Sequence, residues 1–351
     1  MDNIAHTLVG AAIGRATGDS RVPAPAILGA IAANSPDLTE FLPGMPRLRG
    51  SELRFTAHRG ITHSLLGAAI QAAVFVLITG LALLPTYRRE NRRVPWGTLI
   101  GLYAAALASH LLMDWQGSYG LRPFLPWSNQ RYYGDWVAIV DPFFWLVPLV
   151  LLAWGQTRRW GVALATAIGV VAIDGFVLTY GAVAAWVQVA CVALAVVGVV
   201  GWHRHWFAPG ARRTAAVTAL VILGLYTAAQ AVTEMTLKPR LGIAARARFG
   251  PNATYALFTR PGFPFTWDPV MGSVDSVAGP GWTAPRHLDL PVVQQVLRTP
   301  EGQAVSAFER FSTADVDSTR RPAVVYLRET RRPPAGRRGF GIFALESPST
   351  P

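Results

Sequence analysis

Long apolar segments with almost no charged residues dominate the middle of this chain, between residues 62 and 237. An α-helix needs about 20 consecutive apolar residues to cross a bilayer. The whole sequence is 51% hydrophobic and only 15% charged, whereas soluble domains carry about 25% charged residues. We therefore expect a mainly α, polytopic helical membrane protein whose first partner is the lipid bilayer.

Six segments are long or apolar enough to be predicted spans, namely 64–85, 96–114, 140–154 (the shortest), 160–180, 182–202 and 214–236. Two shorter apolar runs, 4–16 and 24–34, precede them and are each too brief to cross alone. The polar stretch TGDSRVP separates these runs. They predict a re-entrant or interfacial helical hairpin that is covered by protein.

Arginines gather in the loops that six spans would place on one side, and these are Arg88, Arg89, Arg92, Arg93, Arg158, Arg159, Arg204, Arg212 and Arg213. By the positive-inside rule that side is cytoplasmic. The opposite side then receives residues 35–63, the loop 115–139 and everything from 238 onward. The net charge of +12 is explained by this topology, and without basic runs among exposed aromatics we expect no nucleic-acid partner.

Residues 238–351 have the composition of an ordinary polar chain and predict a small β-rich soluble domain outside the cytoplasm. Segments 253–259, 323–329 and 340–346 are rich in β-branched and aromatic residues and are separated by Pro and Gly, as strands are. The last residues, ending in SPSTP, are expected to be mobile. Residues 1–237 would form the membrane domain.

With a single cysteine, Cys191, a metal site in this chain must use nitrogen and oxygen ligands. Histidines and aspartates that could supply them are concentrated near predicted segment ends: His6, Asp37, His58, His63, His110, Asp114, Asp135 and Asp141. Hydropathy and arginine placement both put most of this set at the outward-facing ends. Such convergence favours one site over scattered polar residues.

His110 and Asp114 are spaced i, i+4 and share one helix face, so they can converge on one ion or cap a helix end. His58 and His63 do not share a face, but Gly60 can break the backbone between them. Both rings could then point at one site, with Arg59 free to bind an anion. The alternative is two histidines at the lipid interface.

Three further residues have plainer alternatives. Asp37 could be a turn carboxylate after a helix, and His6 could be a packed side chain. Asp174 lies inside a predicted span, where a carboxylate is costly. We expect Asp174 to make a helix–helix hydrogen bond more readily than a transport site.

The order of the motifs HTLVGAAIG, SPDLTE, HRGITHSLLGA, SHLLMDW and IVDPFFW resembles the YdjM-like family of bacterial membrane-bound metal-dependent hydrolases. The resemblance covers about residues 4–145, and HRGxTHS with HxxxD is its most specific part. FPFTWDPV (263–270) resembles a tail motif of some members. Thr39 stands where many members have a second acid, with Glu40 adjacent, which leaves a second metal open. The resemblance implies a bacterial cytoplasmic (inner) membrane location.

The ligand order is also faintly similar to that of zinc-dependent phospholipase C and P1-type nucleases. This similarity implies that Asp37, His58 or His63, His110 and Asp114 hold the principal metal. It would place His6 near a second ion bridged by Asp114. The later histidine ligands of those enzymes have no clear match in this chain.

The function expected from this pattern is metal-dependent hydrolysis of a phosphoester or lipid-linked substrate at the outer membrane face. Zinc is the first choice of ion, and manganese or magnesium also suits the ligand set. Asp135 or Asp141 could act as general base, and Arg59 could stabilise an anionic transition state. The alternatives are a non-enzymatic, metal-stabilised scaffold or regulatory binding protein and, third, a transporter, for which only Asp174 lies at mid-span.

Overall fold

The structure is a computed structural model that describes residues 1–18, 20–38, 60–154, 160–206, 208, 210–331 and 342–348. The chain divides into two compact units. The first extends over 1–39, 61–232 and 259–265, and the second includes 233–258 and 266–351. Each unit is described by itself.

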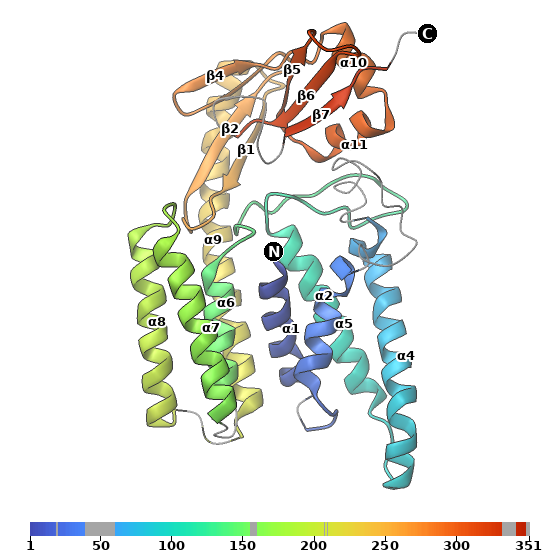
Figure 1. Cartoon of the computed structure of the whole chain (residues 1–351), viewed down its shortest axis with the longest axis vertical. Helices are drawn as coiled ribbons and strands as arrows, with labels where there is room; N and C mark the ends of the chain where they lie inside the picture. Colours follow the sequence, from blue (N-terminus) through green and yellow to red (C-terminus); the bar gives the residue numbers. More distant parts are fainter. Residues whose placement is uncertain are drawn as a thin grey trace. The chain divides into compact units, whose positions relative to one another are not determined.

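Helices build the first unit (Figure 1). In chain order they are α1 (Asn3–Gly18), α2 (Pro25–Leu38), the short 3-10 helix η2 (Ile61–His63), α4 (Leu65–Arg89), α5 (Trp96–Trp115), α6 (Pro142–Trp154), α7 (Trp160–Thr179), α8 (Ala185–Arg204) and α9 (Arg212–Phe249). A core of buried apolar side chains joins several of these helices and includes Ala5, Leu99, Leu102, Tyr103 and Phe144.

Five helices, α4, α5, α7, α8 and α9, are long and apolar enough to cross a membrane. They confirm five of the six predicted spans. The remaining segment, 140–154, forms α6, which has only 13 residues and is shorter than a membrane crossing requires. The two short N-terminal runs form α1 and α2, as predicted.

α9 is longer than the predicted span 214–236, because it continues to Phe249. The residues after 237 are more polar, but Leu, Ala, Arg and Lys are strong helix formers and prolong the helix. The division between the two units falls at residues 232 and 233, inside this helix. The expected domain boundary at 237 therefore also lies within α9.

Glycines allow α1 and α2 to pack closely. A Cβ atom on Gly29 would overlap the carbonyl oxygen of Gly10, and one on Gly14 would overlap the carbonyl oxygen of Pro25. Small residues at helix crossings let two backbones approach in membrane proteins. This contact fixes the position of α2, whose last turn carries Asp37.

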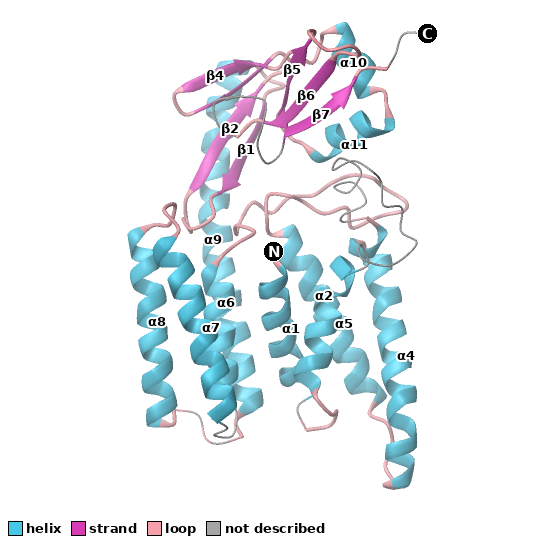
Figure 2. Cartoon of the chain, in the orientation of Figure 1, coloured by secondary structure: helices cyan, strands magenta, loops and turns pink. Residues whose placement is uncertain are grey.

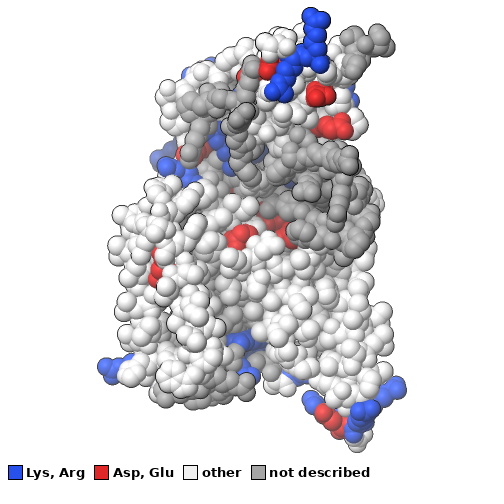
Figure 3. All heavy atoms as spheres, viewed as in Figure 1, with Lys and Arg blue, Asp and Glu red and all other residues white. Residues whose placement is uncertain are grey.

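Charged side chains are sparse on the visible face of the helices and gather at their ends (Figure 3). Arg88 and Arg89 lie in the last turn of α4, and Arg204 ends α8 while Arg212 begins α9. These ends lie at the same side of the first unit (Figure 1). Their placement agrees with the predicted arginine side, whereas Arg158 and Arg159 lie outside the described residues.

The second unit contains two antiparallel sheets (Figure 2). The first has the order β1-β2-β3-β4 and the second β5-β6-β7, with α10 (Pro291–Leu297) and α11 (Pro300–Phe308) between them in the chain. The strands are β1 (Thr254–Thr259), β2 (Trp267–Gly272), β3 (Ser276–Gly279), β4 (Trp282–Pro285), β5 (Ser312–Asp317), β6 (Val324–Glu329) and β7 (Ile342–Glu346).

The three predicted strand segments correspond to β1, β6 and β7. β6 is central in its sheet, with Leu327 opposite Ala314 of β5 and Phe343 of β7, and buried Leu327 and Phe343 belong to one apolar core. Strands β2 to β5 and the two helices were not predicted. Residues 349–351, expected to be mobile, lie outside the described residues.

Candidate metal centre

Four buried side chains converge where α2, η2 and α5 meet. Asp37, His63, His110 and Asp114 each offer one ligand atom, and these four atoms all lie within 4.8 Å of one another. Asp37 comes from the last turn of α2, His63 from η2, and the other two from the last turns of α5. A buried group of this composition could bind a metal ion.

The spacing of the ligand atoms suits a single divalent ion. Nε2 of His63 lies 3.0 Å from Oδ1 of Asp37 and 3.6 Å from Oδ2 of Asp114. Nε2 of His110 lies 3.6 Å from the same Oδ2 of Asp114. Ligands bound at about 2.1 Å in a tetrahedron are about 3.4 Å apart. The donor set therefore fits a metal without rearrangement of the backbone.

His110 is oriented by a backbone contact. Its Nδ1 lies 2.6 Å from the carbonyl oxygen of Ala33, and a carbonyl can only accept, so Nδ1 carries the proton. Nε2 then presents its lone pair to Asp37 and Asp114, and it has no hydrogen-bond partner among the described residues. An imidazole fixed in this way is typical of a metal ligand.

His63 is oriented by a side-chain relay. The Thr62 hydroxyl donates to the carbonyl oxygen of Pro36 at 3.3 Å and lies 3.0 Å from Nδ1 of His63. Because its proton is directed at Pro36, the hydroxyl oxygen is placed to accept from Nδ1. Nε2 is again the nitrogen that faces the carboxylates.

The local sequence explains why His63 sits before a helix. Ser64 is the N-cap of α4, and its hydroxyl accepts a hydrogen bond from the amide of Gly67 at 3.0 Å, which satisfies a free helix amide. A Cβ on Gly67 would overlap the carbonyl oxygen of Ile61. Gln71 donates to the carbonyl of Thr62 at 2.9 Å, so α4 holds the short η2 turn from two sides.

Asp114 also has a cationic partner. The amino group of Met1 lies 2.6 Å from Oδ1 of Asp114, and both groups are buried. His6 of α1 approaches the same Oδ1 at 3.4 Å through Nε2. One oxygen of Asp114 thus faces α1, while the other faces His63 and His110.

His6 has unused coordination capacity. It is fully buried, and neither ring nitrogen has a hydrogen-bond partner among the described residues. Its ring stacks on His110 with centroids 4.0 Å apart. Burial, the largest influence, lowers the pKa of His6, although Asp114 opposes this shift. A buried imidazole whose nearest polar contact is the 3.4 Å approach to the Asp114 carboxylate is a group that a cation would satisfy.

Asp37 is held ionised. It lies in α2, outside the five candidate spans. Burial, the largest influence, raises the pKa of this carboxyl, but the close contacts with His63 and His110 outweigh it and lower the pKa to about 2. A carboxylate that stays deprotonated at neutral pH is ready to bind a cation.

The structure does not bring every predicted residue into this group. Asp141 is buried, but its carboxylate accepts hydrogen bonds from the Tyr226 hydroxyl at 2.6 Å and the Phe143 amide at 2.9 Å. Asp135 is buried in the loop after α5, with a left-handed φ of 59°. His58 and Arg59 lie outside the described residues.

Sequence reasoning missed three groups that orient the ligands. Thr62 stands beside His63 in ITHS, and a hydroxyl neighbour of a candidate ligand is a signal that could have been used. The carbonyl of Ala33 and the amide of Gln71 gave no such signal, because their contacts depend on how α2 and α4 pack. His63 and Asp37 are both buried members of the group of four, whereas the role of His58 stays a prediction.

Comparison with known protein families identifies a match over the helical part of the chain. Residues 1–236 match the family described as "YdjM inner membrane protein", which includes α1 to α8 and most of α9. No curated protein and no solved structure matches the chain. Since the matched region covers well over half of the 351 residues, the chain belongs to the YdjM inner membrane protein family.

Proposed function

We propose that this protein is a membrane-bound, metal-dependent hydrolase that acts on a phosphoester or lipid-linked substrate at the outer face of the cytoplasmic membrane. The observation that carries the proposal is the convergence of Asp37, His63, His110 and Asp114 in one buried group. Two imidazoles and two carboxylates suit zinc first, and manganese or magnesium as well.

A divalent ion held there supplies Lewis-acid polarisation of a substrate oxygen and lowers the pKa of coordinated water. The chain's own residues prepare the site for it. Ala33 and Thr62 fix which nitrogen of His110 and His63 faces inward. His6 lies on the far oxygen of Asp114, where it would bind a second ion.

Three residues have proposed roles beyond ligation. Asp135 or Asp141 would serve as general base, and Arg59 would stabilise negative charge on the substrate. Asp141 already accepts two hydrogen bonds, which leaves it fewer lone pairs for a proton in transfer. Asp135 and Asp141 remain alternatives for this role.

The proposed location follows from the distribution of arginines. The ends of α4 and α8 carry Arg88, Arg89 and Arg204, and the candidate metal centre lies at the opposite end of α5, near Asp114. With the arginine ends in the cytoplasm, the centre faces outward. A substrate that contains a lipid would reach it at the membrane surface.

A second candidate function rests on the number of ligands. Four protein ligands complete a tetrahedral zinc site, as in structural zinc centres. A metal-stabilised scaffold or regulatory binding protein would need no open position. Catalysis with the same four ligands requires five-coordinate zinc, or an octahedral ion such as manganese that keeps positions for water and substrate.

An assay on the detergent-purified full chain separates the two functions. The chain is stripped with a chelator, reloaded with zinc or manganese, and tested on bis(p-nitrophenyl) phosphate and on phospholipid in mixed micelles. A hydrolase shows metal-dependent turnover that His110→Ala abolishes and His203→Ala, on the arginine side, retains. Metal binding without turnover on either substrate class would favour the scaffold.

A further inference from the structure

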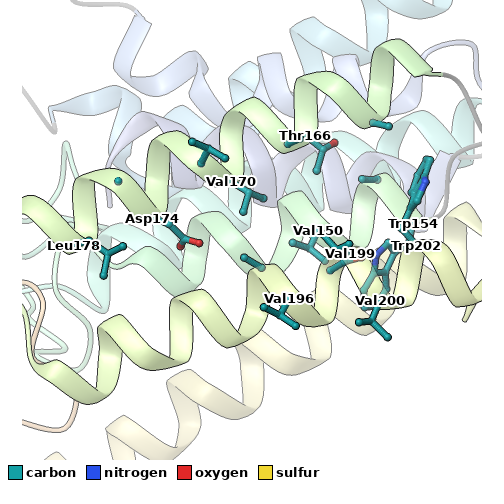
Figure 4. Close-up of a pocket in the computed structure, with 17 residues that line it drawn as sticks. Val150, Trp154, Thr166, Val170, Asp174, Leu178, Val196, Val199, Val200 and Trp202 are labelled. Carbon is teal, nitrogen blue, oxygen red and sulfur yellow. Dashed lines mark hydrogen bonds between the residues drawn. The ribbon is translucent and has the colours of Figure 1, made fainter.

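The first unit contains a second feature that the metal centre does not use. A groove of about 680 Å³ lies between α6, α7 and α8, within the 300–1,000 Å³ range of ligand sites. Its lining is almost entirely hydrocarbon and includes Val150, Val170, Val196 and Val199. Figure 4 shows these side chains around the space between the helices.

One ionisable side chain interrupts this apolar lining. Asp174 of α7 points toward the space between α7 and α8 (Figure 4). Its Oδ1 is buried and has no hydrogen-bond partner among the described residues, so the helix–helix hydrogen bond expected from the sequence is not formed. The lining residues that follow or precede it by one turn of α7, Val170, Val171 and Leu178, have no side-chain donor. An acid within a membrane span is costly unless it is paired.

We infer that the groove between α6, α7 and α8 binds one hydrocarbon chain of a lipid whose polar end donates a hydrogen bond to the Asp174 carboxylate. This inference is independent of the metal centre. The donor is a primary ammonium, hydroxyl or amide N–H, because an ionised carboxylate can only accept.

The surroundings of the groove favour a lipid as occupant. α7 and α8 have mean hydropathies of 2.1 and 2.0 in their apolar windows, of which only 6% and 22% is buried within the chain. Their remaining surface would face bilayer lipid. The groove therefore opens to the bilayer, where lipid hydrocarbon chains are the most abundant groups that could enter it.

The part of the groove between Asp174 and the start of α7 matches half of a bilayer's hydrocarbon core in length. Asp174 lies eleven residues from Ala163, the lining residue nearest the start of α7, which is about 16 Å along a helix. Half of a typical hydrocarbon core is about 15 Å. Asp174 is five residues from the end of α7 at Thr179, which is about 7.5 Å along the helix. A lipid polar group just below the membrane surface could therefore reach its carboxylate.

Gly175 keeps the groove open on α7, because a Cβ there would meet no atom within 4 Å. Across from it, Gly198 of α8 packs closely against Val150, whose side chain would lie 3.2 Å from a Cβ at this position. A hydrocarbon chain, which carries no side chains, can enter beside Gly175.

Photolabelling of the full chain in nanodiscs tests this inference. The probes are phosphatidylethanolamine, which has N–H donors, and phosphatidylcholine, which has none, each with a diazirine in one acyl chain. We expect phosphatidylethanolamine to label Val170 and Val196 in the groove at least fivefold more than Leu164 and Val189, which are exposed on the same helices. Phosphatidylcholine should label the groove about fivefold less, because it cannot donate to Asp174 and the loss of one hydrogen bond lowers an affinity by about this factor.

Two variants and a matched control sharpen the test. Gly175→Leu fills the groove without displacing packed atoms and should reduce its labelling to that of Val189. Gly161→Leu, also on α7 with no atom near its Cβ and outside the groove, should change nothing. Asp174→Leu should remove the preference for phosphatidylethanolamine, and labelling at Leu164 reports that each variant is still inserted.

Three results would overturn the inference. Equal labelling inside and outside the groove would exclude a bound chain. Equal labelling by both lipids would exclude the hydrogen bond to Asp174. Co-purification of a second polypeptide that blocks groove labelling until it is removed would show that the occupant is a protein.

Discussion

The carbonyl oxygen of Ala33 in α2 accepts a hydrogen bond from Nδ1 of His110 in α5 at 2.6 Å. This contact makes the short N-terminal helices part of the metal centre, because α2 supplies both the ligand Asp37 and the group that orients a second ligand. The packing of α1 against α2 therefore sets the geometry of the site. It also explains why two helices too short to span a membrane are held against α5.

A larger residue at the crossing of α1 and α2 should weaken metal binding from a distance. Gly29→Val places side-chain atoms where the carbonyl of Gly10 lies, and overpacking of this kind destabilises by about 1–3 kcal/mol. We expect α2 to shift and the metal affinity to fall at least tenfold. Metal titration followed by thermal unfolding would measure both effects.

Gly101→Val on α5 is the control, because a Cβ there meets no atom within 4 Å. Unfolding can be followed with a maleimide dye, since Cys191 is the only cysteine and is fully buried. If Gly29→Val binds metal as tightly as the wild-type chain, the proposed link between helix packing and the site is wrong.

Removing the Thr62 hydroxyl should loosen His63. Thr62→Val keeps the shape of the side chain but deletes the group 3.0 Å from Nδ1 of His63. Loss of such an orienting partner lowers metal affinity about 10–100-fold. Competition with a fluorescent zinc chelator would give the affinity, and Thr179→Val, whose hydroxyl contacts only its own helix, should leave it unchanged.

The second unit should become less stable as pH rises, because of Glu309. This carboxyl is buried at the end of α11, and burial, reinforced by the charge of Glu329, raises its pKa well above the usual value. The folded state therefore prefers the protonated form. Its contribution to stability is full at pH below the usual value of 4.5 and is lost as pH rises toward the folded pKa.

Glu309→Gln should remove this pH dependence and stabilise the second unit at pH 7.5 by at least about 1 kcal/mol. Hydrogen exchange of the β5 and β6 amides in the full chain, corrected for intrinsic rates, would measure it. Glu346→Gln on an exposed position of β7 is the control. Equal protection of the wild type and Glu309→Gln at pH 7.5 would contradict the assignment.

Tyr226 should support Asp141 structurally rather than through the metal. Its hydroxyl donates to Asp141 at 2.6 Å, and Tyr226→Phe leaves the buried carboxylate with one donor fewer. We expect a loss of about 1–3 kcal/mol of unfolding free energy with the metal content unchanged. Thermal unfolding and metal analysis of the same sample would show it, and loss of metal would place Asp141 closer to the site than proposed.

Hydropathy predicted the long helices because burial in lipid depends on composition over about 20 residues. It also marked α1 and α2 as short helices. Their close crossing could not be predicted, since it depends on the helix face with Gly10 packing against the helix face with Gly29. The helical extension of α9 to Phe249 was missed because a polar sequence after a span is compatible with either a loop or a helix.

The proximity of His110 and Asp114 could be predicted from spacing alone, because i, i+4 residues share a helix face; their role as ligands stays a prediction. Only the tertiary fold brings His63 and Asp37 next to this pair. The family resemblance indicated the order of these residues along the chain but not their positions in space. In the second unit, β6 was visible from its β-branched and aromatic residues, Val324, Val325 and Tyr326. β3 and β4 have only four residues each, too few for alternation to show.

The central claim is that Asp37, His63, His110 and Asp114 form one metal site, and elemental analysis of the purified full chain tests it most directly. After exposure to zinc or manganese and removal of loosely bound ions, we expect at least about one divalent ion per chain. Asp114→Ala should retain at least about tenfold less metal per chain. Asp289→Ala, at an exposed position of the second unit, should retain as much metal as the wild type. A wild-type chain that retains no divalent ion, or an Asp114→Ala chain that retains as much as the wild type, would contradict the account.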